Sequence, residues 1–198
     1  MQKPYSQACE NNKDPILHKI KDIFLESKTV WEIGSGTGQH ACYFAQNLPH
    51  LYWQATDRKE NLAGINAWLD EASLVNVGRS VALNVSDEPW PCEEIEALFT
   101  ANTLHIMSWQ EVERFFIGLS KYLSKGAVVC IYGPFNYNGD YTSSSNEQFD
   151  KSLRARDSRS GLRDFEAIVE LAKSTKLMIN DDFDMPANNR LLVFRNQP

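Results

Sequence analysis

Apolar residues along the chain occur in two alternating patterns. Short continuous runs, typical of buried strands, lie at 29–33, 51–56, 80–85, 97–102 and 127–133. Between several of these runs, apolar side chains recur at the three- or four-residue spacing of a helix, within 40–48, 62–71 and 108–123. Strands that alternate with helices in this way predict a mostly parallel sheet joined by right-handed crossovers.

Two helix starts carry local signals. Asp14 followed by Pro15 predicts a first helix over about 14–26, with Asp14 as its N-cap. Ser108 and Glu111 have the spacing of a capping box, which predicts that a helix begins after Ser108.

The pattern changes after residue 133. Residues 134–148 are polar and rich in turn-forming residues, which predicts a long loop that could act as a lid. A helix is expected over 162–175, and strands over 177–183 and 190–196 are close enough in sequence to form an antiparallel hairpin. The predicted fold class is therefore α/β, a Rossmann-like doubly wound and mostly parallel sheet of about seven strands, with a C-terminal antiparallel hairpin and helices on both faces.

Length and composition indicate one domain. The 198 residues, 42% of them hydrophobic, can bury one ordinary core. We divide the single domain 1–198 into an N-terminal segment and helix (1–28), a core (29–133) and a part with the lid loop, a helix and the hairpin (134–198).

Charge and cysteine usage exclude several classes of protein. The net charge of −6 and the absence of long Lys/Arg runs argue against a nucleic-acid partner. The polar N-terminus and the lack of an apolar run of about 20 residues argue against a signal peptide or membrane span, so we expect a soluble, cytoplasmic protein. The four cysteines are widely spaced, so we expect neither a metal site nor a disulfide framework.

The stretch VWEIGSGTGQH at 30–40 is the first candidate for chemistry. Its three alternating glycines, Gly34, Gly36 and Gly38, come directly after a predicted strand. Glycine lowers stability in a strand, so its use here indicates that the backbone needs positive φ or that another group must approach the backbone closely. A dinucleotide fingerprint requires a small residue where this chain has Gln39, and the Lys-Ser/Thr ending of a P-loop is absent. A nicotinamide-dependent dehydrogenase therefore remains only a disfavoured alternative.

Asp57 is the second candidate. It ends the strand that follows the glycine loop, where the two oxygens of a carboxylate can accept hydrogen bonds from both hydroxyls of a ribose. The alternative is that Asp57 caps the helix that starts near Lys59. A ribose site without a phosphate site points to an adenosyl ligand, and S-adenosylmethionine fits this description.

An acidic residue, one spacer and G-x-G-x-G, at Glu32 to Gly38, resemble the first motif of the Rossmann-like (class I) S-adenosylmethionine-dependent methyltransferases. That resemblance covers about 29–133. More narrowly, the chain resembles an uncharacterised methyltransferase-like family found in bacteria and eukaryotes, and this resemblance spans nearly the whole chain. The stretches that carry it are NNKDPIL, GSGTGQHA, WQATD, ANTLHIMSW, YGPF, FDKSLRARD and MPANNRLLVF.

The resemblance implies a set of residues that bind S-adenosylmethionine: Glu32, Gly34, Ser35, Gly36, Gly38, Asp57, Asn84, Val85, Ala101 and Asn102. The glycine backbone would pass beside the methionyl and ribose parts, and Asp57 would hold the ribose hydroxyls. Asn84 with Val85 would meet the adenine. Ala101 and Asn102 would offer a carbonyl or amide to the ammonium group.

Four residues are candidates for a substrate pocket: His105, Trp109, Tyr137 and Asn188. His105 could act as a base near neutral pH, but a structural role is the alternative, and no catalytic residue is assigned. Trp109 and Tyr137 could line the pocket or cover the sheet edge. Asn188 lies at the predicted hairpin tip, where Asn is a normal turn residue.

From these observations we expect an enzyme that transfers the methyl group of S-adenosylmethionine to a small-molecule acceptor. The alternative is a protein that binds S-adenosylmethionine or S-adenosylhomocysteine without transferase activity, as a sensor or partner subunit. The sequence leaves the acceptor and the oligomeric state open.

Overall fold

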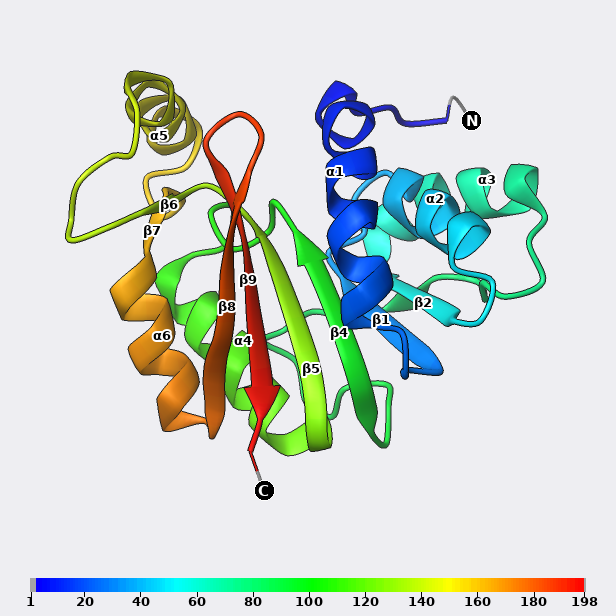
Figure 1. The fold of residues 1–198 in the computed structure, drawn as a ribbon. Helices are drawn as coiled ribbons and strands as arrows, with labels where there is room; N and C mark the ends of the chain where they lie inside the picture. The colour runs from blue at the N-terminus through cyan, green and yellow to red at the C-terminus, as the bar shows by residue number, and fades with distance from the viewer. Residues whose placement is uncertain (1–2, 198) are drawn as a thin grey trace.

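The computed structural model describes residues 3–197, and over these residues the chain forms a seven-stranded sheet with helices on both faces (Figure 1). The helices are α1 (Gln7–Ile23), α2 (Gln39–Asn47), α3 (Leu62–Ala72), α4 (Trp109–Tyr122), α5 (Ser144–Arg156) and α6 (Phe165–Ser174), with a 3-10 turn η1 (Lys59–Asn61). The strands are β1 (Thr29–Ile33), β2 (Tyr52–Asp57), β3 (Val81–Ala82), β4 (Ile95–Ala101), β5 (Leu123–Gly133), β6 (Phe135–Asn136), β7 (Arg163–Asp164), β8 (Leu177–Met185) and β9 (Asn189–Asn196).

The strand order of the sheet is β3-β2-β1-β4-β5-β9-β8. Neighbouring strands from β3 to β5 are parallel, whereas β9 runs antiparallel to both β5 and β8. The order reverses at β1, where the chain crosses to β4, and ligands of doubly wound sheets bind at such a point. The predicted fold class, including the C-terminal antiparallel hairpin, is confirmed.

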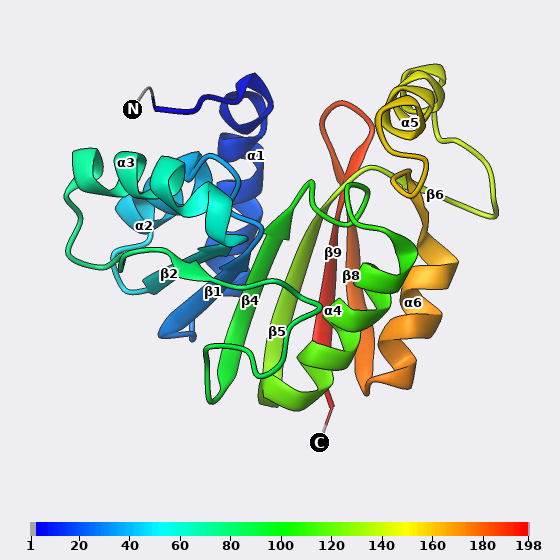
Figure 2. The same cartoon turned by 180° about the vertical axis from the view of Figure 1, so that it is seen from behind.

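Each face of the sheet has its own core. On one face α1, α2 and α3 pack on residues such as Trp53 and Phe99. On the other face α4 and α6 pack on residues such as Leu98 and Ile131, as Figure 2 shows from behind. The predicted capping box of α4 is confirmed, because Glu111 N donates to Ser108 Oγ at 3.3 Å and Ser108 N donates to the Glu111 carboxylate at 2.7 Å.

The predicted start of the first helix is wrong. Helix α1 begins at Gln7 with Ser6 as its N-cap, so Asp14 and Pro15 lie inside it. The missing N–H of Pro15 leaves one backbone carbonyl without its helical partner, which the rest of a 17-residue helix tolerates. The helix also ends earlier than predicted, at Ile23.

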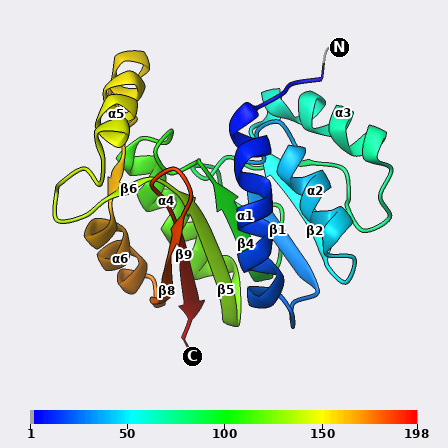
Figure 3. The ribbon, with the colours of Figure 1, turned by 45° about the horizontal axis from the view of Figure 1, so that its top comes forward.

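Two further predictions need correction. The third strand, expected over 80–85, is limited to Val81–Ala82, because Asn84 turns the chain by accepting a hydrogen bond from Ser86 N at 3.1 Å. The loop expected over 134–148 instead contains β6 and, from Ser144, the start of α5. Figure 3 shows α5 and the first turns of α1 at the same end of the sheet, on opposite sides of the β8–β9 turn.

Within residues 3–197, no helix has both the length and the apolar character that crossing a bilayer would require.

Candidate functional site

The glycine loop folds back against the end of β2. Gly34 N and Ser35 N both donate to the carbonyl of Thr56 at 3.0 Å. All three glycines have positive φ, of 76°, 58° and 90° for Gly34, Gly36 and Gly38. The backbone conformation by itself therefore favours glycine at all three positions.

The space around the three glycines differs. A Cβ at Gly34 would lie 2.7 Å from the Thr103 side chain, and one at Gly38 would lie 3.1 Å from the backbone of Ile65. A Cβ at Gly36 would meet no heavy atom within 4 Å. Packing thus explains two of the glycines, whereas Gly36 borders open space.

Asp57 ties this loop to the next strand. Its Oδ2 accepts from Gly36 N at 2.7 Å, and its Oδ1 accepts from Arg58 N at 2.7 Å and from Asn61 Nδ2 at 2.8 Å. The carboxylate is not the N-cap of α3, because Asn61 occupies that position. A carboxylate has about four lone-pair sites, so Oδ2 can accept one further hydrogen bond.

A cavity of about 880 Å³ opens beside the loop, at the carboxyl ends of the strands. This volume lies in the range of about 300–1,000 Å³ that is typical of small-molecule sites. The cavity brings together most of the residues predicted from the sequence: Gly34, Ser35, Gly36, Asp57, Asn84, Val85, Ala101, Asn102 and His105. Their roles in binding remain predictions.

Glu32 and Gly38 do not line this cavity. Gly38 begins α2 against Ile65, as described above, and supports the loop from behind. Glu32 is only 1% exposed, and its Oε2 accepts from Trp53 Nε1 at 2.9 Å in the core. Burial raises the pKa of Glu32 to about 7, against the lowering effect of the indole hydrogen bond. In this structure the Glu32 side chain therefore lies in the core and not on the cavity surface.

Trp109, Tyr137 and Asn188 also lie outside the lining of the cavity, and their assignment to a substrate pocket stays a prediction. Trp109 starts α4 beside the guanidinium of Arg163. The Tyr137 hydroxyl donates to Asp182 at 2.8 Å. The carbonyl of Asn188 accepts a hydrogen bond from α5. The hairpin residues that line the cavity are Pro186, Ala187 and Asn189.

Helix α5 supplies a wall that the sequence did not predict. Asn146 and Phe149 line the cavity, and Asn146 Nδ2 donates to the Asn188 carbonyl at 3.2 Å, which links α5 to the hairpin. Ser143, a residue type that often caps helices, was the signal in the sequence that could have indicated α5. In the structure it is the N-cap, and Asn146 N donates to Ser143 Oγ at 3.1 Å. A cap without an apolar stripe is too weak to predict a helix.

His105 is the one predicted substrate-side residue that does reach the cavity. Its side chain is 5% exposed and meets the ring of Phe149 edge-on, with centroids 5.3 Å apart. Burial, together with the nearby charges of Arg163 and Arg156, lowers the pKa of His105 to about 4. The imidazole is therefore neutral at pH 7 and offers one hydrogen-bond donor and one acceptor.

Arg163 fixes the loop that carries His105. The buried guanidinium donates to the carbonyl of Leu104 at 3.1 Å and to the carbonyl of Met107. Gly161 N donates to the carbonyl of His105 itself at 2.9 Å. These bonds hold the loop after β4 from both sides of His105.

Gln39 is a further residue whose role the sequence did not reveal. Its Oε1 accepts from Ser6 N at 2.6 Å, and its Nε2 donates to Ser6 O at 3.3 Å and to Glu10 at 2.7 Å. These bonds hold the first turn of α1 against the glycine loop, so that α1 becomes part of the cavity wall. Because the partners lie about 30 residues apart, no local pattern marks them.

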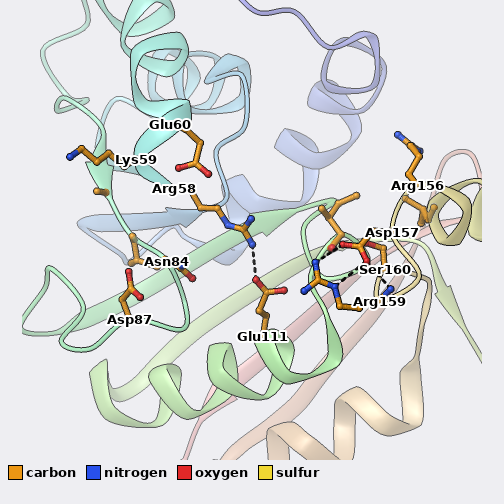
Figure 4. A pocket seen from close by; sticks show the side chains of 14 residues that line it. Arg58, Lys59, Glu60, Asn84, Asp87, Glu111, Arg156, Asp157, Arg159 and Ser160 are labelled. Atoms are coloured by element: carbon orange, nitrogen blue, oxygen red, sulfur yellow. Dashed lines mark hydrogen bonds and ion pairs between the residues drawn. The ribbon is translucent and has the colours of Figure 1, made fainter.

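A second pocket, of about 730 Å³, adjoins the cavity, and the lining residues that both share are Arg58, Leu83, Asn84, Ile106, Leu153 and Arg156. Its walls are charged, and Figure 4 shows ion pairs between residues that line it. Arg58 pairs with Glu111 at 2.6 Å, which connects the end of β2 to α4. The cavity thus opens on this side toward a charged, solvated rim.

The sequence matches the family described as "Protein of unknown function (DUF938)" over residues 3–196. The chain belongs to this family. DUF938 is thus the uncharacterised family that the motifs indicated, and the predicted resemblance is confirmed.

Solved structures share the fold of this DUF938 chain. An O-methyltransferase family protein from Burkholderia thailandensis has a TM-score of 0.81 at 14% identity, over 93% of this chain and 56% of that one. The apo form of the S-adenosylmethionine-dependent methyltransferase SibL has a TM-score of 0.80 at 16% identity, over 96% of this chain and 56% of that one.

A third neighbour is an O-methyltransferase family 2 protein from Planctomyces limnophilus, in complex with apigenin, with a TM-score of 0.78 at 14% identity over 94% of this chain and 56% of that one. At these identities the likeness concerns the fold, which is that of class I S-adenosylmethionine-dependent methyltransferases. The DUF938 chain spans 56% of the length of each of these three proteins.

Proposed function

We propose that this protein is an S-adenosylmethionine-dependent methyltransferase that acts on a small-molecule acceptor. The methyltransferase fold supports this proposal, as does a cavity at the strand ends with the volume of a small-molecule site. When bound, S-adenosylmethionine supplies a methyl group that its sulfonium makes electrophilic. The protein then needs mainly to align the acceptor and to exclude water.

The observation that carries the proposal is the open space at Gly36. This glycine lies on the cavity wall, and a Cβ at this position would have no heavy atom within 4 Å, while the Gly36 N–H is held by Asp57. A ligand can therefore approach the backbone directly at this point. The free lone pair of Asp57 suits a ribose hydroxyl, and no phosphate group is needed to explain the site.

Other residues would hold the remaining parts of the ligand. Asn84 and Val85 line the part of the cavity near β3 and would face the adenine. The Ala101 carbonyl already accepts from Thr103 Oγ1 at 3.0 Å and has one lone pair left for an ammonium group. The first turns of α1, the hairpin and α5 would limit the access of water.

A matched pair of glycine variants tests the proposal. Gly36 and Gly126 both have positive φ and open space where a Cβ would lie, but Gly126 is remote from the cavity lining. Replacement of either by Ala should therefore cost a similar amount of stability, roughly 1–2 kcal/mol. Calorimetry with S-adenosylhomocysteine should show about tenfold or more weaker binding for Gly36→Ala alone. Equal affinity in both variants would contradict the proposed site.

A second experiment separates an enzyme from a binding protein. The wild-type chain is incubated with metabolite extracts and S-adenosylmethionine labelled in its methyl group, with Gly36→Ala as the control. We expect label in a small-molecule fraction with the wild type only. Binding of S-adenosylhomocysteine without transfer to any fraction would favour the binding protein instead.

A further inference from the structure

One wall of the cavity is almost free of charged side chains. This wall is formed by α1, the loop after β4, α5 and the β8–β9 turn, and we call it the acceptor wall. Among the described residues that line it, Arg156 is the one Asp, Glu, Lys or Arg side chain. Arg156 is exposed at the end of α5, where it also borders the charged neighbouring pocket (Figure 4). The interior of the acceptor wall therefore offers no partner for a buried charge.

The acceptor wall does offer a free hydrogen-bond acceptor on Asn146. The side chain is 5% exposed, and its Nδ2 donates to Thr142 Oγ1 at 2.9 Å and to the Asn188 carbonyl at 3.2 Å. The carbonyl of Asn188 can only accept, so this contact fixes the orientation of the amide. Asn146 Oδ1 makes none of the hydrogen bonds recorded within residues 3–197.

His105 adds a second free acceptor. Its ring nitrogens take no part in the hydrogen bonds recorded among the described residues, and its neutral ring has one acceptor nitrogen. Within residues 3–197, the side-chain polar atoms that are sealed, meaning that they have neither solvent access nor a hydrogen-bond partner, are Trp90 Nε1 and Asn136 Oδ1. His105 and Asn146 both line the cavity, and their free atoms are not among these sealed atoms.

The remaining surface of the acceptor wall combines apolar or aromatic side chains with uncharged polar ones, such as those of Asn12, Ser145 and Asn189. Phe149 lies edge-on to His105 and lines the cavity, together with Tyr132, Pro134 and Pro186. An apolar ring or chain can pack against these side chains, while a polar group of the same molecule reaches the two acceptors.

We propose that the methyl acceptor is an uncharged hydroxyl compound with an apolar body, whose O–H donates to Asn146 Oδ1 or to the His105 ring. A carboxylate would be anionic and an amine cationic at neutral pH. Among the described residues of the acceptor wall, an amine would find no carboxylate, and a carboxylate would find the exposed Arg156 as its one cationic side chain, at the solvated edge. A thiol is uncharged but a weak donor. The inference rests on the proposed methyl transfer, since it names the class of molecule that shares the cavity with the cofactor.

Three probes with one ring and different charges test this inference. Benzyl alcohol, benzoate and benzylamine are titrated into the full chain saturated with S-adenosylhomocysteine, and binding is followed by NMR. We expect benzyl alcohol to bind about tenfold or more tightly than either charged probe. Benzoate or benzylamine binding as tightly as benzyl alcohol would overturn the inference.

Two variants assign the effect to the acceptor wall. His105→Phe keeps a ring but removes both nitrogens, and should weaken benzyl alcohol binding about tenfold while the affinity for S-adenosylhomocysteine is retained. His18→Phe, on the exposed face of α1, is the matched control and should change neither affinity. Unchanged benzyl alcohol binding in His105→Phe would remove His105 from the site.

Asn146→Asp places a carboxylate in the same wall and should reverse the preference toward benzylamine. Because the new oxygen would face the Asn188 carbonyl, the thermal unfolding of Asn146→Asp is measured first. A folded variant that still prefers benzyl alcohol contradicts the inference. If the variant does not fold, the probe series with the wild type and His105→Phe decides. If S-adenosylhomocysteine fails to bind the wild type, the proposed function fails, and the same titration of the free chain still tests the charge preference of the acceptor wall.

Discussion

Replacement of Glu32 by Gln is expected to stabilise the protein above neutral pH. Glu32 is buried at the end of β1, where its Oε2 accepts from Trp53 Nε1 at 2.9 Å. A Gln carbonyl oxygen can keep this hydrogen bond without carrying a charge. The variant therefore removes the cost of ionising a buried carboxyl group and leaves the indole with a partner.

The sign and size of the effect follow from the pKa of Glu32. Burial raises the pKa from its ordinary 4.5 to about 7, so the folded state holds the proton more tightly than the unfolded state. The contribution of Glu32 to stability is therefore fully present below about pH 4.5 and is lost as the pH rises through about 7. Between about pH 5 and pH 8 this loss amounts to about 2.5 kcal/mol.

Urea unfolding of the wild type and Glu32→Gln at these two pH values measures the effect. The stability of the variant relative to the wild type should be higher at pH 8 than at pH 5 by about 2.5 kcal/mol. Glu60→Gln, at an exposed carboxyl group in η1, is the control and should show no such difference. Parallel pH profiles for the wild type and Glu32→Gln would refute the reasoning. Because Glu32 does not line the cavity, the affinity for S-adenosylhomocysteine should stay within about twofold.

Three other predictions concern the loop, the wall of α1 and acid pH. Asp57→Ala should weaken S-adenosylhomocysteine binding by more than about 1 kcal/mol, because Gly36 N loses its acceptor and the ligand loses a charged partner; unchanged affinity in calorimetry would remove Asp57 from the site. Gln39→Ala should cost roughly 2 kcal/mol of stability and speed hydrogen exchange at residues 6–10, so unchanged exchange there would contradict the role of Gln39. The pKa of His105 is lowered to about 4, so its contribution to stability is present above about pH 6.5 and is lost as the pH falls toward 4. His105→Phe should flatten this part of the profile of unfolding free energy against pH. An equally steep profile would count against a buried neutral imidazole.

The parts of the fold that the sequence predicted are those fixed by local rules. Strand runs and apolar stripes located β1, β2, β4, β5 and α4, and the Ser108 capping box placed a helix start correctly. Helix α5 escaped prediction because its buried residues are mostly polar. Asp150 is almost fully buried, yet it is satisfied by Arg154, the Tyr141 hydroxyl and Leu162 N, partners that only the folded chain brings together.

The candidate site shows the same division. Gly34, Gly36 and Asp57 line the cavity because the end of a parallel strand fixes where the next residues lie. Glu32 was assigned to the cofactor through a motif, whereas strand alternation places it on the face of Val30, toward the core that contains Trp53. Alternation along β1 is the signal in the sequence that marks this burial of Glu32.

The two sides of the cavity are built in different ways, and this difference has a functional consequence. The glycine loop is held by backbone bonds to Thr56 and by Asp57, all within one crossover unit. The acceptor wall is assembled from α1, α5 and the hairpin, and among the contacts that join these segments are the single bonds of Asn146 and Ser145 to Asn188. Substitutions in α5 can therefore alter the acceptor wall without displacing the glycine loop. If the proposed function holds, affinity for the cofactor and choice of acceptor are separable properties of this chain, and the acceptor must be sought through residues such as Asn146 and His105.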